Sequence, residues 1–191
     1  MKLVILDRDG TINRDSDDFV KAPEEWEPLP GALEGIARLN HAGWHVAVAS
    51  NQSGLGRGLF DVAALNAIHA KMHKALSAVG GRIDAVFYCP HSPDEGCQCR
   101  KPLPGLFEQI GERFGVDLKS TPVVGDTLRD LQAGALVGCA PHLVLTGKGE
   151  ALRGLPLPDT FPHGTRVHDN LSAFADWLIE RPQPARGMLA P

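Results

Sequence analysis

Two aspartates two residues apart follow a short apolar run near the start of the sequence. Leu3 to Leu6 are too few for a helix and predict a buried strand that ends at Asp7 and Asp9. Open α/β sheets bind ligands at the carboxyl ends of such strands. Two carboxylates this close repel each other in a low-dielectric pocket, so the pair indicates one raised pKa or a bound cation. A divalent metal is the simpler interpretation.

Other polar residues follow later apolar segments in the same way. Residues 46–49 predict a second buried strand that ends at Ser50, and residues 121–124 predict one followed by Gly-Asp126. Lys101 stands in Arg-Lys-Pro, shortly after a third apolar run. Because the carboxyl ends of parallel strands meet at one edge of a sheet, we expect these side chains to gather beside the two amino-terminal aspartates.

Three cysteines and one histidine lie within eleven residues, at Cys89, His91, Cys97 and Cys99. Thiolates and imidazole are the ligands that a closed, tetrahedral Zn²⁺ site requires. The Cys-x-His and Cys-x-Cys spacing differs from that of zinc-finger modules, so the pattern predicts a loop, residues 89–99, folded around a structural zinc ion. The alternatives are free cysteines in a turn or a strained disulfide.

Other candidate ligands have simpler interpretations. His69 and His73 have the i, i+4 spacing that can bind zinc, but the glutamate of His-Glu-x-x-His is missing, and a solvated helix face is the better interpretation. Cys139 lies in an apolar run and is expected to be a buried thiol. The glycines at 54, 56 and 58 match neither a dinucleotide fingerprint nor a P-loop, and predict a flexible turn.

Size and charge limit the possible functions. The 191 residues carry a net charge of −4, which provides no basic field for nucleic acid or an anionic membrane. No apolar run approaches the roughly 20 residues of a membrane span, and the sequence opens on a strand rather than a signal sequence. We therefore expect a cytoplasmic protein, a monomer, with one domain over 1–180 and a flexible tail at 181–191.

Strand and helix patterns alternate along the sequence. This alternation predicts an α/β, Rossmann-like fold with a mostly parallel sheet and helices on both faces. An acidic, proline-containing loop is expected over 14–30. The expected strands cover 3–6, 46–49, 85–88, 121–124, 143–146 and a short edge strand at 167–169, and the expected helices cover 31–43, 61–79, 103–114 and 171–179.

The segment Asp7-x-Asp9-Gly-Thr resembles motif I of the haloacid dehalogenase-like (HAD) phosphotransferases. The resemblance implies that Asp7 is the nucleophile that attacks phosphorus and that Asp9 is the general acid/base. It also implies that Ser50 and Lys101 hold the phosphoryl group. The implied Mg²⁺ ligands are Asp7, Asp126 and the backbone carbonyl of Asp9. For Asp130 the sequence leaves two roles open, in support of the metal site or as a helix-start charge.

Four segments narrow the resemblance to one group within that superfamily. Asp-Arg-Asp-Gly-Thr-Ile-Asn, Ser-Asn-Gln-Ser-Gly, the Cys/His segment with Arg-Lys-Pro, and Val-Gly-Asp are similar to the D-glycero-D-manno-heptose-1,7-bisphosphate 7-phosphatase family over almost the whole sequence. This implies a small sugar bisphosphate as substrate, no large cap domain, and a step in ADP-heptose synthesis for lipopolysaccharide core. The alternatives are a histidinol-phosphate phosphatase, which shares the zinc loop, and a zinc-stabilised binding module without catalysis.

Several polar residues near these motifs are candidates for binding the sugar or its second phosphate. Arg100, next to Lys101, suits a second anionic group. The full set is Asn13, Asp15, Ser16, Asp17, Asp18, Asn51, Gln52, Ser53 and Arg100.

Overall fold

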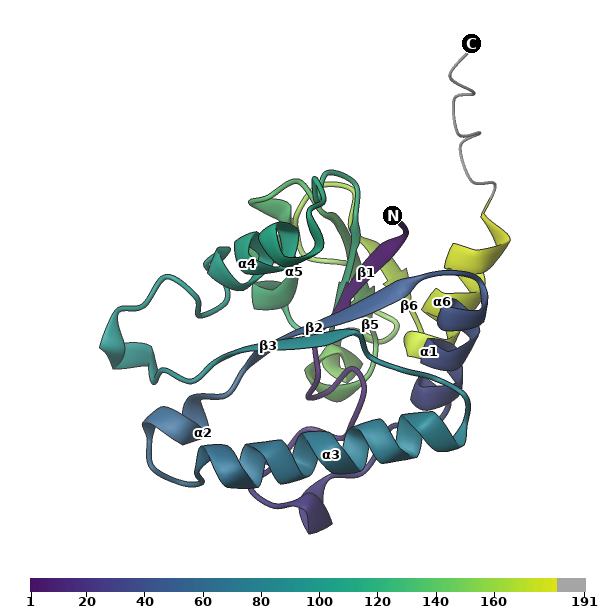
Figure 1. Ribbon diagram of the computed structural model, residues 1–191. Coiled ribbons are helices and arrows are strands. Elements are labelled where there is room, and N and C mark those ends of the chain that lie inside the picture. The colour runs from purple at the N-terminus through teal and green to yellow at the C-terminus, as the bar shows by residue number, and fades with distance from the viewer. Residues whose placement is uncertain (182–191) are drawn as a thin grey trace.

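A single parallel sheet of six strands forms the centre of the protein in the computed structural model, which describes residues 1–181 (Figure 1). Residues 182–191, which are all of the expected tail except its first residue, lie outside the described residues. The strand order is β3-β2-β1-β4-β5-β6, and every neighbouring pair is parallel. The strands are β1 (Leu3–Leu6), β2 (His45–Asn51), β3 (Ala85–Cys89), β4 (Pro122–Gly125), β5 (Ala140–Val144) and β6 (Arg166–His168).

Helices cover both faces of this sheet (Figure 1). Val4 and Leu6 of β1 pack into the core under α1 (Ala32–His41), α3 (Val62–Ala78) and α6 (Leu171–Glu180). Leu3 and Ile5 point to the opposite face and pack with α4 (Gly105–Phe114) and α5 (Leu128–Ala135). Successive strand residues alternate between the two faces, so a strand covered on both sides is apolar at every position. The fold class expected from the sequence is confirmed.

The central strand β1 has β2 on one side and β4 on the other. From β1 the chain therefore adds strands first on one side, β2 and β3, and then on the other, β4, β5 and β6. This reversal opens a crevice at the carboxyl ends of β1 and β4, which is where such sheets bind ligands. Within residues 1–181, the segments from β1 to β2 and from β2 to Lys101 contain the core elements α1, α3 and β3, the one-turn helix α2 (Ser53–Gly56) and short 3₁₀ turns, so no large cap covers the crevice.

Three expected elements differ in detail from the structure. The segment around Gly54 and Gly56 is a one-turn helix, α2, instead of a simple turn. The helix expected over 103–114 begins two residues later, at Gly105. The fifth strand begins at Ala140, three residues earlier than expected. The sequence pattern does not reveal this start, because the strand contains Pro141 and a proline inside a paired strand is rare.

The long helix α3 begins directly after its N-cap residue Asp61, whose Oδ1 accepts a hydrogen bond from the backbone N–H of Ala64 at 2.8 Å. None of the helices in residues 1–181 combines the length and apolar character that crossing a bilayer requires.

Candidate active site

Three aspartates from two segments converge at the crevice. Asp7 follows β1, Asp126 follows β4, and Asp130 lies in the first turn of α5. Each is buried, and their carboxylate oxygens lie within 4.8 Å of one another. Gly10, with a φ of +82°, makes this approach possible, because a Cβ at this position would collide with the carboxylate of Asp126. The fold thus places three acids where a cation could bind.

The Lys101 ammonium lies between two of these acids. Its Nζ is 2.7 Å from Asp7 Oδ1 and 2.6 Å from Asp130 Oδ1, and it donates to the carbonyl of Ala49 at 2.7 Å. Burial favours the neutral amine, but the charges of Asp130 and Asp7 outweigh burial and hold the pKa of Lys101 above its usual value. Lys101 is therefore a fixed positive charge beside the candidate nucleophile.

Two of the acids are held in an environment that opposes their ionisation. Burial, reinforced by the charge of Asp130, raises the pKa of Asp7 to about 7, although Lys101 acts in the other direction. Burial and the charge of Asp7 raise the pKa of Asp126 to about 8. A divalent cation would favour the ionised form of both, and carboxylate oxygens are the ligands that Mg²⁺ prefers.

The hydrogen bonds indicate which oxygens could face a cation. Asp126 Oδ2 accepts from the backbone N–H of Lys148 at 2.8 Å, whereas Asp126 Oδ1 is buried and has no partner among residues 1–181. Both oxygens of Asp130 are engaged: Oδ1 contacts Lys101, and Oδ2 accepts from the N–H and hydroxyl of Thr127 at the start of α5. Asp130 thus holds Lys101 and caps the helix, which leaves Asp126 as the better metal ligand.

The side chain of Asp9 lies apart from this cluster. Its oxygens accept hydrogen bonds from Arg8, from Asn13 Nδ2 at 2.9 Å and from Gln52 Nε2 at 2.8 Å. Burial alone would raise its pKa, but the charge of Arg8 and these hydrogen bonds outweigh burial and hold the pKa of Asp9 below its usual value. The side chain is thus separate from the metal cluster, which is compatible with a role in proton transfer.

A cavity of about 270 Å³ opens above these acids. Of the residues that the sequence analysis selected for binding substrate, seven line it: Asp15, Ser16, Asp17, Asn51, Gln52, Ser53 and Arg100. Asn13 and Asp18 do not, and neither does Ser50, whose buried hydroxyl accepts from Gln52 Nε2 at 2.8 Å. Asn51 also has a local task, because its amide exchanges hydrogen bonds with the backbone N–H and C=O of Lys101.

Three further basic residues line the cavity, and sequence analysis did not select them. They are Arg57, which follows α2, Arg129 at the start of α5, and Lys148. Burial and the neighbouring charges of Arg129 and Arg57 lower the pKa of Arg100, so three guanidinium groups lie close enough to repel one another. The only signal in the sequence was the Gly-Lys-Gly pattern around Lys148. The arginines stand in segments far apart along the chain.

The expectation that both histidines of α3 are exposed is correct for one of them and wrong for the other. His73 is exposed, but His69 is buried, and its Nε2 lies 3.2 Å from Nη1 of Arg8. The spacing of apolar residues along α3 does not reveal that a polar partner, Arg8, lies against His69.

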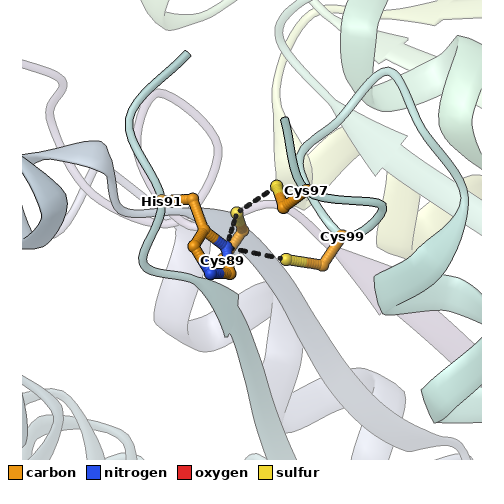
Figure 2. A group of neighbouring side chains, drawn as sticks. All are labelled: Cys89, His91, Cys97 and Cys99. Carbon is orange, nitrogen blue, oxygen red and sulfur yellow. Dashed lines mark hydrogen bonds between the residues drawn. The ribbon is translucent and has the colours of Figure 1, made fainter. Parts of the chain in front are cut away.

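The Cys/His segment forms a compact cluster beside the cavity. Figure 2 shows Cys89 at the end of β3 facing His91, with Cys97 and Cys99 approaching from the returning side of the loop. Cys89 Sγ lies 3.6 Å from Cys97 Sγ, and His91 Nδ1 lies 3.3 Å from Cys99 Sγ and 3.5 Å from Cys89 Sγ. The three cysteines are free thiols, and together with His91 they could hold a metal ion.

These distances agree with four ligands around one ion. Metal–sulfur bonds of about 2.3 Å and tetrahedral angles place neighbouring sulfurs roughly 3.8 Å apart. The loop also packs closely on α2, where a Cβ at Gly56 would lie 2.7 Å from the backbone nitrogen of Ser92. Because Arg100 and Lys101 follow the last cysteine directly, the folded loop fixes where both enter the cavity. The buried, unpaired Cys139 agrees with its expected role.

Comparisons with known proteins agree with this geometry. Residues 98–173 match the HAD-hydrolase-like family model, and residues 2–130 match the polynucleotide kinase 3 phosphatase model. The chain is 59% identical over 180 residues to the D-glycero-β-D-manno-heptose-1,7-bisphosphate 7-phosphatase of Bordetella bronchiseptica, covering 94% of this chain and 99% of that protein. It is 52% identical to the enzyme of that name from Pseudomonas aeruginosa, with 93% and 98% covered. The chain belongs to this 7-phosphatase family. It is a HAD-type phosphatase.

Solved structures of the 7-phosphatase family have the same fold. The crystal structure of the B. bronchiseptica D,D-heptose 1,7-bisphosphate phosphatase, complexed with magnesium and phosphate, has a TM-score of 0.87 and covers 94% of this chain and 98% of its own. The Burkholderia thailandensis phosphatase has a TM-score of 0.71 at 54% identity, with 95% and 100% covered. Membership in the 7-phosphatase family favours an enzyme over the alternative of a binding module without catalysis.

Proposed function

We propose that this chain removes the 7-phosphate of D-glycero-β-D-manno-heptose 1,7-bisphosphate in a Mg²⁺-dependent reaction, on the route to ADP-heptose for the lipopolysaccharide core. The observation that carries the proposal is a cavity with an acidic floor and a rim of three arginines. An acidic floor suits metal-assisted transfer of one phosphate, and the rim suits a second phosphate. The names of the relatives supply the sugar, its anomer and the position of cleavage.

The proposed Mg²⁺ ligands are the carboxylates of Asp7 and Asp126 and the backbone carbonyl of Asp9. When bound, Mg²⁺ would stabilise negative charge on the nucleophile and the phosphoryl oxygens. The unpartnered Asp126 Oδ1 and the raised pKa values of Asp7 and Asp126 support this set, as does the magnesium in the B. bronchiseptica structure.

Two steps would complete the reaction. In the first, the carboxylate of Asp7 attacks phosphorus, the bond from phosphorus to the sugar oxygen breaks, and Asp9 in its protonated form gives its proton to that oxygen. Because the groups around Asp9 favour its ionised form, only the protonated fraction of the enzyme can start this step. In the second, water attacks the aspartyl phosphate, Asp9 takes a proton from the water, and Asp7 and inorganic phosphate are released. Each step has a lower barrier than direct attack by water on the ester.

Lys101 and Ser50 are proposed to hold the phosphoryl group during transfer. Lys101 is already fixed against Asp7, so its charge requires no reorganisation when negative charge develops on the phosphoryl oxygens. The Ser50 hydroxyl accepts a hydrogen bond from Gln52, which leaves its own proton available to donate to a phosphoryl oxygen.

The second phosphate is proposed to bind at Arg57, Arg100 and Arg129. Three guanidinium groups that repel one another gain most from a multivalent anion, and arginine binds phosphate through paired hydrogen bonds. Sugar hydroxyls would then meet the polar wall formed by Asp15, Ser16 and Asp17. Histidinol phosphate carries a single phosphate and would leave the rim unpaired.

We further propose that the Cys/His cluster holds Zn²⁺ with a structural role. Four protein ligands leave no open coordination position for substrate or water. The loop from residue 89 to 99 has few apolar residues with which to order itself, so ion binding would supply the missing stability.

A direct comparison of substrates tests the proposal. Phosphate release in Mg²⁺ should give a kcat/KM at least about 100-fold higher for the β-heptose 1,7-bisphosphate than for histidinol phosphate, if two or more arginine contacts distinguish them. The phosphorus NMR spectrum of the product should retain the 1-phosphate. The same assay on the α anomer, as a third substrate, tests the proposed preference for the β anomer. A preference for histidinol phosphate, or loss of the 1-phosphate, would reject the proposal.

Variants of the rim sharpen that test. Arg129→Met should lower kcat/KM for the bisphosphate by about tenfold, the value of one phosphate contact, and leave kcat/KM for a heptose 7-monophosphate unchanged. Equal losses on both compounds would place Arg129 outside the second phosphate site.

The monomeric state and the cytoplasmic location stay predictions.

A further inference from the structure

A fully buried arginine lies between the two motif I aspartates and has no role in the reaction described above. Arg8 is 0% exposed, and its guanidinium makes two sets of contacts. Nε and Nη2 donate to Asp9 Oδ1 at 3.0 and 2.9 Å, and Nη2 also donates to Asp9 Oδ2 at 3.0 Å. On its other side, Nη1 lies 3.2 Å from Nε2 of His69. Burying a guanidinium is costly, so such a residue needs close partners.

His69 can serve as the second partner only when it is neutral. Burial, followed by the charge of Arg8, lowers the pKa of His69 to about 4. The ring is therefore uncharged near neutral pH, and Nε2 is the acceptor because the guanidinium has only donors. Since His69 belongs to α3, this contact connects the acid beside β1 to the long helix on one face of the sheet.

Arg8 differs in kind from the other groups that hold Asp9. Asn13 and Gln52 each donate one hydrogen bond from a neutral amide to one oxygen. The guanidinium contacts both oxygens, and a two-point contact fixes the plane of a carboxylate as well as its position. The Asp9 side chain is 20% exposed and lines the cavity, so the direction of this plane decides which oxygen meets a substrate.

We propose that Arg8 is a positioning residue that, anchored by His69, sets the direction in which Asp9 presents its carboxylate to the leaving sugar oxygen and to the hydrolytic water. This inference rests on the proposed function, because it assumes the acid/base role of Asp9. In the described part of the chain, Arg8 has no hydrogen bond to Asp7, Asp126 or Lys101. A loss of its anchor should therefore reduce proton transfer and leave phosphate and metal binding intact.

Variants of His69 test the inference without removing a buried charge. His69→Leu removes the acceptor, whereas His69→Gln retains an oxygen near the position of Nε2. We expect kcat on the heptose bisphosphate to fall about tenfold in the leucine variant, a typical loss for a slightly misplaced proton-transfer group, and to recover most of that loss in the glutamine variant. KM and the Mg²⁺ concentration for half-maximal rate should stay unchanged in both. His73→Leu, one turn along α3 and exposed, is the matched control.

Arg8→Lys provides a second test, since lysine keeps the charge but cannot form the fork. If the variant is folded by circular dichroism, its kcat should fall by about 100-fold, with KM unchanged. Wild-type kcat in a folded His69→Leu protein would overturn the inference. So would a fall in kcat that His69→Gln does not relieve, or one that comes with a higher Mg²⁺ requirement.

The proposed function fails by a different result. If the wild-type protein releases no phosphate, or if Asp9→Asn keeps full activity, the acid/base role itself is wrong. If the wild-type protein is active, Asp9→Asn is inactive and the His69 variants are all normal, only the positioning role is wrong.

Discussion

The carboxylate centre and the Cys/His loop lie at the same edge of the sheet, but the fold holds them in different ways. Asp7 and Asp126 end two neighbouring core strands and are 8% and 3% exposed. The Cys/His loop, residues 89–99, has only a 3₁₀ turn at Pro93–Glu95 as regular structure, and of its four ligands only Cys89 is fully buried. The first site is built by the sheet before any ion binds. The second, we propose, depends on a bound ion for its order.

The two sites should therefore fail differently. Changes to the acids of the carboxylate centre should reduce activity and have little effect on folding, because the strands that carry them are stabilised by the core; the buried Lys101 between them is the exception, since its loss leaves two acids without a positive partner. Changes in the Cys/His loop should reduce stability and have less effect on the chemistry. Four experiments could break or sharpen this contrast.

The largest effect is expected for Asp7→Asn. An amide cannot form the acyl phosphate, so kcat should fall by about 10⁴-fold or more. The thermal midpoint should not fall, because the change removes one of three crowded acids. Phosphate release and thermal unfolding are the measurements, and Glu112→Gln, an exposed acid in α4, is the control. Retained activity would reject Asp7 as the nucleophile.

Lys101→Met should affect both properties. Because Asp7 and Asp130 would lose their shared positive partner, we expect kcat to fall by about 10³-fold and the free energy of unfolding to fall by about 3 kcal/mol. Mg²⁺ should restore part of the stability and little of the rate. Chemical denaturation with and without Mg²⁺ measures this, with the exposed Lys74→Met as control. Unchanged stability would show that the two acids do not need this lysine.

Cys99→Ser tests the other side of the contrast. Loss of one ligand should remove bound zinc and lower the free energy of unfolding by about 3 kcal/mol, equivalent to about 100-fold in the folding equilibrium. The kcat of the remaining folded protein should fall by less than about tenfold. Cys139→Ala removes a buried thiol outside the loop and should leave the zinc content unchanged. Equal stability of the two variants would reject a structural metal in the loop.

The smallest effect concerns pH. In the folded protein burial raises the pKa of Asp7 to about 7 and that of Asp126 to about 8, whereas in the unfolded chain both carboxyls ionise near pH 4. Without a divalent cation their contribution to stability therefore falls as the pH rises from about 4 to about 8. Mg²⁺ competes with these protons, so its affinity should rise by about tenfold between pH 6 and pH 8.

Calorimetric titration in magnesium-free buffer measures this change, and chelators are omitted so that they do not remove the ion proposed for the Cys/His loop. Asp126→Asn should remove most of the pH dependence. A flat affinity in the wild-type protein would mean that the two carboxyls are already ionised at pH 6.

Much of the fold could be predicted because both faces of the sheet are covered. A strand such as β1, buried on both sides, appears in the sequence as a continuous apolar run, and each polar motif marks the end of one. The start of β5 was misplaced where Pro141 interrupts that signal. His69 was misjudged for a related reason, since periodicity records apolar neighbours and not a buried charge such as Arg8.

The sequence by itself determined the chemistry that is local in the chain: the paired acids after the first strand, the four soft ligands within eleven residues, and the order of strands and helices. Only the tertiary structure decided the partnerships between distant segments. It placed Lys101 between Asp7 and Asp130, brought His69 to Arg8, the partner of Asp9, and brought three arginines to one rim. Such partnerships depend on which strand ends lie side by side, and strand order in space follows from packing across the whole sheet and not from spacing along the chain.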